Sequence, residues 1–515
     1  MKRILAFLLV IVLVMGVFTA CEGGTDKDAT GEKILTYGSG DYTAINPALY
    51  EHGEINLLIF LGLTAHDADN NIIPAAAKDW SYDESTFTYT FNLREGLKFH
   101  DGKPLTSEDV KFTIDVIKDS DNGSENASNF EDITNVTAVG EMTVTVTLAA
   151  PNVAILDYLT IGILPKHLLE DKDIATDSFN QNPIGAGPYM LTGWDIGQSI
   201  TLEKFNDFYL GAPNIDQIIF KIVGDSDARA LQLKSGELDF AQITPKAMTQ
   251  FEGDDSYNIH VMKTADYRGI MYNFNSDFFG RHPELPNILS YAVDREAIVD
   301  SVLLGHGYAA YSPLQAGDYN NDKIEKYAYD TAMAKQLLEE AGWAIGDNGY
   351  YQKDGEELAF DINNGQSDPV RVDMSNLCAQ NFQDIGINAT VKINAETDWA
   401  NQDAYLIGWG SPFDPDDHTY KVFATDKGAN YSGYSNSVID GLLQQARELE
   451  TYEERLPLYQ EFQMELSKDL PYTFITYIDA IYVGKAGISG ITDKTILGHH
   501  GVGIFWNIYD WDIAW

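Results

Sequence analysis

Residues 404–420, AYLIGWGSPFDPDDHTY, hold the densest group of side chains that could do chemistry. Residues 404–407 are typical of a strand, and glycines on both sides of the next aromatic residue leave the main chain open to close approach. Carboxylates follow directly. This combination suits an extended peptide, whose backbone can add as a strand while a carboxylate meets its ammonium group. The residues expected to contact such a ligand are Gly408, Trp409, Gly410, Asp414 and Asp416.

Metal binding is the alternative chemistry for this run, because Asp417 and His418 add a further oxygen ligand and an imidazole. The run lacks the ligand spacing and the central glycine of an EF-hand loop. A second candidate is the adjacent pair His499 and His500, although ten histidines in 515 residues make a chance pair unsurprising. We therefore predict no resident metal or other cofactor and keep this pair as the alternative metal site.

The sequence does not indicate an enzyme. Its 78 Asp and Glu residues guarantee chance carboxylate pairs of the kind that glycosidases use. There is no G-x-S-x-G elbow, no H-E-x-x-H motif and no Cys/His pair in a recognisable setting. The glycines of residues 182–194, NPIGAGPYMLTGW, are not followed by the Lys-Ser/Thr of a P-loop. We expect a protein that binds its solute without converting it.

The elements that position these residues are those of an α/β protein. Over residues 87–93 aromatic and apolar residues alternate with Thr and Asn, which predicts a half-buried strand. The Glu95–Gly96 pair then predicts a turn into a returning strand at residues 97–99. Thr106, with Asp109 three residues on, predicts the start of a helix.

Further along the chain, strands alternate with helices, which favours α/β lobes. Asp330 and Gly342 predict the two ends of one helix. The pairs at residues 348–349 and 354–355, Asn-Gly and Asp-Gly, predict hairpin turns. Pro457 predicts that the helix after Thr451 begins near the proline, because an interior proline would cost about 3 kcal/mol.

Residues 93–110, LREGLKFHDGKPLTSEDV, closely resemble the signature of the family 5 extracellular solute-binding proteins, the peptide- and nickel-binding subunits of ABC importers. Residues 182–194 are a second phrase similar to this family, and YAVDREAI at residues 291–298 is a third. Within the signature, His100 is expected to be structural. The resemblance spans nearly all of the mature chain, is strong at residues 87–112 and 182–194, and is looser after residue 280.

The resemblance implies a fold and a division into domains. The fold is an α/β, two-lobed, periplasmic-binding-protein-like clamp (type II, cluster C) with an additional subdomain inserted in lobe one. Lobe one would comprise residues 34–69, 183–276 and 479–515, the inserted subdomain residues 70–182, and lobe two residues 277–478. The two crossings between the lobes would lie near Asn275 and near Tyr477–Ile478.

The resemblance also implies roles for individual residues. In related peptide binders an aspartate three residues after the tryptophan holds the peptide N-terminus. Here that position is Pro412, so either Asp414 or Asp416 replaces it or the ligand lacks the amine. The nickel-binding branch uses histidine, which His499 and His500 could supply. The opposite wall of the cleft would be formed by Gly40, Asp41, Tyr42 and Thr43. Arg371 would pair with a carboxylate of the ligand.

The N-terminus predicts export. Residues 1–20 have a basic start, a short apolar run and small residues before Cys21, as in a secretory signal peptide. Cys21 resembles the cysteine of a lipoprotein box, so we expect it to carry lipid that anchors the protein to the cell membrane. Residues 21–33 would then be a lipidated cysteine and a flexible tether. The second cysteine, Cys378, is expected to be a core thiol.

A formal net charge of −44 makes nucleic acid an improbable partner, because phosphate would be repelled. We predict a monomeric, extracytoplasmic, lipid-anchored binding subunit of an ABC importer. It would capture dipeptides or oligopeptides by hinge closure and deliver them to permease subunits driven by cytoplasmic ATPases. The alternatives are a nickel chelate or another small solute such as an oligosaccharide, then a carboxylate-based hydrolase or a surface receptor without transport.

Overall fold

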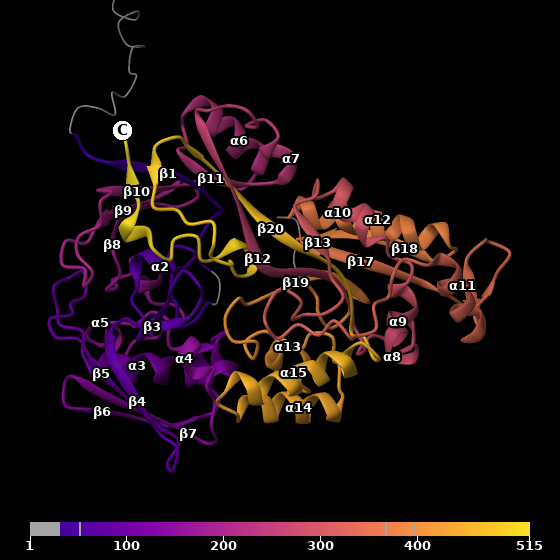
Figure 1. The fold of residues 1–515 in the computed structure, drawn as a ribbon, viewed down its shortest axis with the longest axis horizontal. Helices are drawn as coiled ribbons and strands as arrows, with labels where there is room; N and C mark the ends of the chain where they lie inside the picture. Colours follow the sequence, from indigo (N-terminus) through magenta and orange to yellow (C-terminus); the bar gives the residue numbers. More distant parts are fainter. Residues whose placement is uncertain (1–30, 51–52, 366–367, 396) are drawn as a thin grey trace, which may run out of the picture.

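The computed structural model describes residues 31–50, 53–365, 368–395 and 397–515, which form two α/β halves joined by one large sheet (Figure 1). The predicted signal peptide, the predicted lipidation site Cys21 and residues 22–30 of the predicted tether lie outside these residues. Within them, no helix is both long enough and apolar enough to cross a membrane.

The central sheet has 11 strands and mixes parallel with antiparallel pairs. Strands β1, β10 and β11 are parallel in the first half, and β17, β18 and β19 are parallel in the second. In spatial order the strands are β18 (Asn388–Asn394), β17 (Ala359–Gly365), β19 (Ala404–Trp409), β12 (Tyr257–Tyr272), β20 (Tyr472–Lys485), β11 (Phe240–Ile243), β1 (Ile34–Ser39), β10 (Gln217–Ile222), β9 (Ser199–Lys204) and β8 (Tyr189–Asp195), with β13 (Gly307–Ala309) beside β20.

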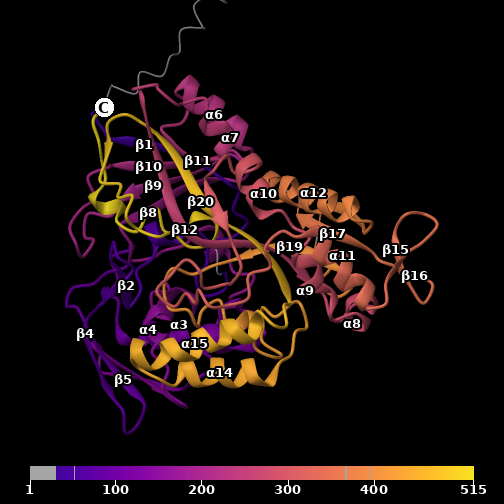
Figure 2. The same ribbon diagram turned by 45° about the vertical axis from the view of Figure 1, so that its right-hand side comes forward.

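The two long antiparallel strands β12 and β20 run through both halves (Figures 1 and 2). Their pairing is interrupted between Lys263 and Tyr267. Before this break β20 also pairs with β11, and after it β12 also pairs with β19. The break is therefore the place where the sheet can bend. The proposed domain boundaries stay a prediction, and residues 267–272 already belong to the sheet of the second half.

The first half carries a separate four-stranded sheet in the order β4 (Ala77–Asp83), β5 (Thr88–Leu93), β7 (Thr143–Leu148) and β6 (Ile133–Val139). Helix α3 (Ser107–Lys118) packs on it. The predicted capping box is confirmed, because the backbone N–H of Thr106 donates to Asp109 at 2.8 Å and the reciprocal bond is present. The predicted alternation in β5 is also confirmed, with Tyr89, Phe91 and Leu93 buried.

The predicted hairpin between residues 87–93 and 97–99 is wrong. Both edges of β5 are occupied by β4 and β7, so no edge is left for residues 97–99. Those residues form only an isolated bridge, between Lys98 and Pro104. Phe87 lies in the turn between β4 and β5 with a positive φ of 51°.

His100 joins the two stretches that resemble the solute-binding family. Its Nδ1 accepts a hydrogen bond from the Gly185 N–H at 3.2 Å, and its Nε2 lies 3.1 Å from the Gly187 carbonyl. Burial lowers the pKa of His100 to about 4. A Cβ at Gly185 would lie 1.9 Å from the Ile59 carbonyl oxygen, which explains the glycine there. His100 thus has a structural environment.

The second half is built on both faces of β17, β19 and the ends of β12 and β20. One core lies against α9 to α12 and the other against α13 to α15. Asp330 caps α11 and Gly342 follows it with a positive φ, both as predicted. The helices are α8 (Asp277–Arg281), α9 (Leu285–Ser290), α10 (Arg295–Ser301), α11 (Thr331–Glu340), α12 (Pro369–Asp384), α13 (Tyr420–Phe423), α14 (Ser437–Arg447) and α15 (Tyr452–Leu466).

Helix α15 begins at Tyr452, so the predicted start near Pro457 is wrong. Thr451 is its N-cap, and its side chain accepts a hydrogen bond from the Glu454 N–H at 3.4 Å. Buried Tyr459, Phe462 and Leu466 hold the helix against the core despite the proline.

Short elements complete the described chain. The predicted turns at residues 348–349 and 354–355 join the three strands β14 to β16. The elements are α2 (Asn56–Ile59), α4 (Ile155–Tyr158), α5 (Lys166–Leu169), α6 (Ser226–Ser235), α7 (Pro245–Met248), β2 (Thr64–His66), β3 (Ile72–Pro74), β14 (Ala344–Ile345), β15 (Tyr351–Lys353), β16 (Glu356–Glu357), β21 (Ile488–Ser489) and β22 (Asp512–Ile513).

Candidate functional site

The glycines around Trp409 make room for the protein's own chain. In the antiparallel register Gly408 lies opposite Arg268 of β12, and a Cβ at Gly408 would lie 2.0 Å from the guanidinium. A Cβ at Gly410 would lie 1.9 Å from the Ala265 carbonyl oxygen. The close approach predicted from these glycines therefore occurs, and β12 is the partner that the structure shows.

Trp409 faces the core beneath α13 to α15. Strand β19 alternates, so Trp409 shares its face with Tyr405 and Ile407, and only 7% of it is exposed. Its ring centroid lies 5.4 Å from that of His418 and 6.3 Å from that of His499. The indole therefore supports the loops around the site more than it presents an open aromatic face.

A charged cluster lies where β12 crosses between the halves, and Asp266, Arg268 and His499 are its buried members. Asp266 forms an ion pair with Arg268, and its Oδ1 lies 2.9 Å from Nδ1 of His499. The backbone N–H of His500 donates to the other Asp266 oxygen at 2.9 Å. His500 has φ 58°, a left-handed conformation that few histidines adopt. One Arg371 nitrogen lies 3.5 Å from Nε2 of His500. The structure thus brings three predicted site residues, Arg371, His499 and His500, together.

The electrostatics of this cluster favour a neutral imidazole beside a cation. Burial, together with His499, Arg268 and Arg371, lowers the pKa of His500 well below its usual value. Burial and Arg268 lower the pKa of Arg371 to about 10, so this guanidinium remains charged at neutral pH. It is paired with Asp368 at 3.2 Å. The cluster can therefore receive a carboxylate at Arg371 and a hydrogen-bond donor or a metal-bound group at an imidazole.

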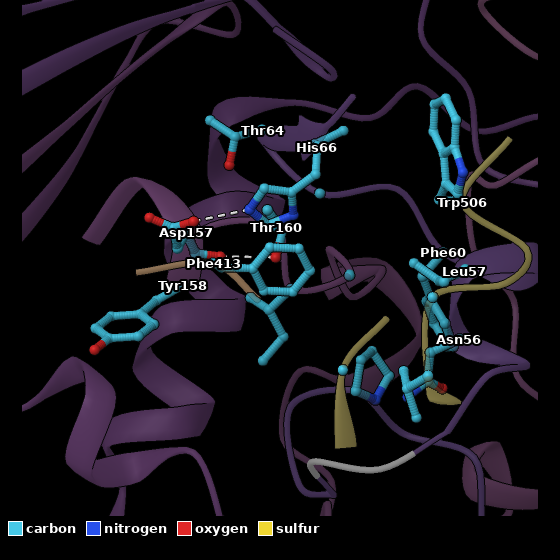
Figure 3. Close-up of a pocket in the computed structure, with 18 of the residues that line it drawn as sticks. Asn56, Leu57, Phe60, Thr64, His66, Asp157, Tyr158, Thr160, Phe413 and Trp506 are labelled. Carbon is cyan, nitrogen blue, oxygen red and sulfur yellow. Dashed lines mark hydrogen bonds and ion pairs between the residues drawn. The ribbon is translucent and has the colours of Figure 1, made fainter. Parts of the chain in front are cut away.

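A cavity of about 490 Å³ adjoins this cluster (Figure 3). Its walls come from both halves of the molecule, and His499 is one of the lining residues. The lining is largely apolar. First-half residues include Leu57, Phe60, His66, Asp157 and Trp506, and second-half residues include Pro412, Phe413, Asp417 and His418.

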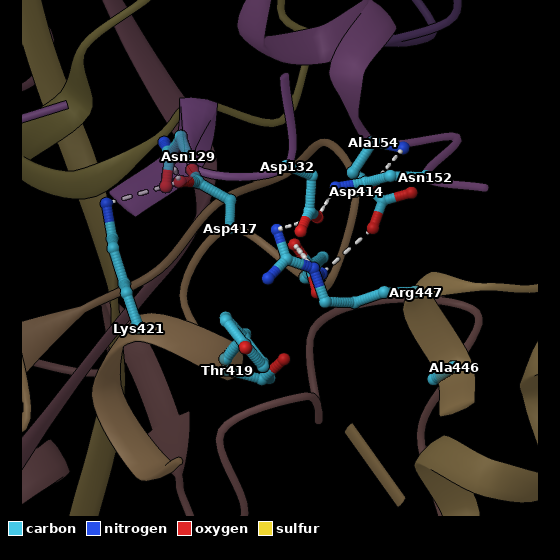
Figure 4. Close-up of polar contacts among 12 residues, drawn as sticks. Asn129, Asp132, Asn152, Ala154, Asp414, Asp417, Thr419, Lys421, Ala446 and Arg447 are labelled. Atoms are coloured by element: carbon cyan, nitrogen blue, oxygen red, sulfur yellow. Dashed lines mark hydrogen bonds and ion pairs between the residues drawn. The ribbon is translucent and has the colours of Figure 1, made fainter. Parts of the chain in front are cut away.

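Asp414 and Asp416 do not line this cavity. Figure 4 shows Asp414 near Arg447 and Asp132. Asp414 accepts two hydrogen bonds from the guanidinium of Arg455 on α15, at 2.5 and 2.7 Å. Asp416 accepts from the Tyr158 hydroxyl at 2.6 Å and lies 3.2 Å from Nε of Arg447 on α14. Both carboxylates are thus engaged inside the protein, and their expected role in holding a ligand amine remains a prediction.

Arg447 connects the inserted four-stranded region of the first half to the second half. Its guanidinium lies 3.3 Å from Glu131, 3.2 Å from Asp132 and 3.2 Å from Asp416, and the side chain is 1% exposed. Figures 1 and 2 show α14 and α15 beside α4 of the first half. Arg447 is therefore the centre of a buried polar joint across the interface.

The charges of this joint are unequal. Burial raises the pKa of Asp416 to about 6, although Arg447 partly opposes the rise. Burial also disfavours the charged form of Arg447, but the pKa of Arg447 is raised because Asp416, Tyr158 and Asp132 surround it. Several acids thus share one cation, so Arg447 stays charged while Asp416 takes up a proton easily.

The predicted opposite wall follows β1. Gly40, Asp41 and Thr43 are exposed, and the Tyr42 ring lies 6.4 Å from that of Phe220. None of the four lines the cavity. The structure therefore leaves this segment on the surface of the first half, and its pairing with a ligand backbone stays a prediction.

Sequence reasoning missed two groups at the site. Asp266 and Arg268 carry a signal, because they are two opposite charges at alternate positions within residues 264–272, which are otherwise uncharged. Glu54 carries none. Glu54 is half-buried, it accepts hydrogen bonds from the Tyr37 and Tyr482 hydroxyls at 2.7 and 3.1 Å, and desolvation raises its pKa.

Among the described residues, no cluster of three or more His, Cys, Asp and Glu side chains could hold a metal ion. A metal that arrives with its own chelating ligand would need fewer protein groups.

Comparisons with known proteins agree on one family. Residues 71–431 match the model of the bacterial extracellular solute-binding proteins, family 5 Middle. The chain is 31% identical over 492 residues to Protein XP55 of Streptomyces lividans, covering 92% of this chain and 90% of that protein.

Two solved structures are similar over almost their whole length. NikZ of Campylobacter jejuni, in complex with Ni(L-His), is 36% identical with a TM-score of 0.88, covering 93% of this chain and 99% of NikZ. The oligopeptide-binding protein AppA of Bacillus subtilis, in complex with a nonapeptide, is 28% identical with a TM-score of 0.86, covering 94% of this chain and all of AppA. These likenesses confirm the two-lobed fold predicted from the sequence.

Proposed function

Because the chain belongs to the bacterial extracellular solute-binding proteins of family 5, we propose that it captures peptides between its two halves for an ABC importer. Supporting this proposal, the cavity of about 490 Å³ takes its walls from both halves. Such a volume is ordinary for a small-molecule site. Closure on a peptide would bury the ligand without any covalent step.

The polar end of the ligand would lie at the charged cluster. The Arg371 side chain is half-buried and its guanidinium stays charged at neutral pH, so it can pair with a peptide carboxylate in two parallel hydrogen bonds. The remainder of the peptide would extend past His499 into the cavity. Gly40, Asp41, Tyr42 and Thr43 would approach the peptide backbone on closure.

A nickel chelate is the second candidate solute. The rings of His499 and His500 are 3.9 Å apart, and Arg371 lies beside His500. A chelate carrying carboxylates could meet Arg371 while one imidazole binds the metal. NikZ of C. jejuni, which was solved with Ni(L-His), is 36% identical to this chain.

Mass spectrometry of the solute that copurifies with the protein separates the two candidates. Calorimetry with a tetrapeptide panel and with Ni²⁺ plus L-histidine then measures each affinity. A peptide carrier would bind at least one tetrapeptide with a Kd below about 10 μM, and a chelate carrier would bind only the nickel mixture. Binding of neither would contradict both assignments.

His500→Asn is the variant that distinguishes them, because asparagine tolerates the left-handed backbone but lacks the imidazole. A chelate site would lose nickel binding, whereas a peptide site anchored by Arg371 would keep most of its affinity. His167→Ala is the matched control, because that histidine lies on the first half in contact with Asp101.

Anchoring and delivery complete the proposal. Lipid on Cys21 would hold the protein at the cell membrane, and the closed form would dock on permease subunits as a monomer. The extracellular location of the family supports this arrangement.

A further inference from the structure

The cavity has an unusual wall of exposed apolar side chains. Tyr50, Leu57, Leu210 and Phe413 line it, and each is between 36% and 51% exposed. Such residues contact water in the absence of a ligand, which is unfavourable by roughly 25 cal/mol for each Å² of apolar surface. Exposed apolar surface gathered in one concave place is typical of a binding site.

The charges at the cavity have one sign. Asp67, Asp157 and Asp417 line it, while no lysine or arginine does so among the described residues. Asp417 has a partner in Lys421 at 3.2 Å, and Asp157 has one in His66 at 2.8 Å. A carboxylate brought into this space would be repelled, whereas an ammonium or guanidinium group would be attracted.

One wall of the cavity is a stack between the two halves (Figure 3). The rings of His66 on β2 and Phe413 after β19 lie 3.6 Å apart at 5°. Asp157 fixes the orientation of His66 through the contact to Nε2. Because its two members come from opposite halves, opening of the halves would separate the two rings.

We infer that this cavity selects peptides by one bulky apolar side chain and rejects acidic residues, with the His66–Phe413 stack limiting the size of the side chain that fits. The inference rests on the proposed peptide function. It adds the class of ligand, an apolar or basic peptide, and the residues that set it.

The test uses the full protein, tetra-alanine as the reference peptide and sixteen substituted tetrapeptides. Each is tetra-alanine with Leu, Phe, Lys or Glu at one of the four positions, and calorimetry at pH 7 gives the Kd. At one position Leu and Phe should bind about tenfold or more tightly than Ala, as expected for burying one apolar side chain. Glu should bind about tenfold less tightly than Ala at that position.

Two variants assign the selectivity to the cavity. Leu57→Arg places a cation in the wall, so the preference for Lys over Glu should reverse. Leu231→Arg is the matched control, because Leu231 on α6 is 65% exposed and does not line the cavity. Phe413→Ala should raise the affinity for the Phe peptide relative to the Leu peptide at least threefold, and a thermal melt checks that each variant is folded.

The outcomes separate the inference from the proposed function. Tight binding of all peptides within threefold of each other would overturn the selectivity and leave peptide capture standing. An unchanged Lys-to-Glu ratio in Leu57→Arg would remove the cavity as its source. Binding of Ni²⁺ with L-histidine, and of no peptide up to 1 mM, would overturn both.

Discussion

Replacing Asp416 by Asn tests which effect dominates the contribution of this carboxylate to folding stability. The two effects are the cost of burying its charge and its attraction to Arg447. The pKa of Asp416 is raised from 3.8 to about 6. This shift means that the fold favours the neutral carboxyl over the charged one by about 3 kcal/mol of free energy. Between these two pH values the folded protein holds a proton that the unfolded chain has lost. Stability contributed by this group therefore falls as pH rises from 3.8 to 6.

Asparagine resembles the protonated carboxyl and does not titrate. At pH 7 the Asp416→Asn variant should be as stable as the parent or more stable, by up to about 3 kcal/mol, although an ion pair with Arg447 has been removed. At pH 4 the two proteins should be nearly equal. Asp157, whose pKa is also raised mainly by burial, is present in both and cancels in the difference.

Urea unfolding followed by tryptophan fluorescence at pH 4, 5, 6 and 7 gives these differences. Asp414→Asn is the control, because it breaks a bidentate pair with Arg455 and should cost about 3–5 kcal/mol. If Asp416→Asn were clearly less stable than the parent at pH 7 and kept the pH slope of the parent, attraction to Arg447 would outweigh burial and the reasoning would be refuted.

Three further predictions concern the site and the anchor. Trp409→Ala should lower the melting temperature as well as the ligand affinity, because removing this buried ring costs about 3–5 kcal/mol, and a thermal melt beside calorimetry would show whether only binding changes. Arg371→Lys should weaken peptides with a free C-terminus about tenfold and leave their amides unaffected, since lysine lacks the planar fork; equal losses for both would argue against a carboxylate contact. Cys21→Ser should release the protein into the medium, and retention in the membrane fraction after a carbonate wash would contradict lipidation.

Local features of the fold could be predicted from the sequence because neighbouring residues determine them. The cap at Thr106, the cap at Asp330 and the two hairpin turns near residue 350 each depend on a few adjacent side chains. The wrong hairpin after residue 93 fails for the opposite reason. Its turn residues permit a return, but β7, about fifty residues later, occupies the edge that the returning strand needs.

The candidate site depends even more on contacts between residues that are far apart in the sequence. The sequence marks the residues around Trp409 as unusual, but what these residues face depends on remote segments. Gly408 is needed because of Arg268, and Pro457 is tolerated in α15 because Tyr459 and its neighbours are buried. A single sequence contains no signal that pairs such positions.

The charge composition explains why carboxylates are the least reliable guide to a ligand site in this sequence. With 78 Asp and Glu against 34 Lys and Arg, most acids must stay in water. A buried acid then requires one of the few cations, and Asp266, Asp414 and Asp416 each have a buried arginine. These arginines lie 2, 41 and 31 positions further along the chain from their partners. The carboxylates most conspicuous in the sequence are therefore the ones already paired inside the fold. Arg371, the residue proposed to meet a ligand carboxylate, is itself paired with Asp368 at 3.2 Å, so a ligand carboxylate would have to compete with Asp368.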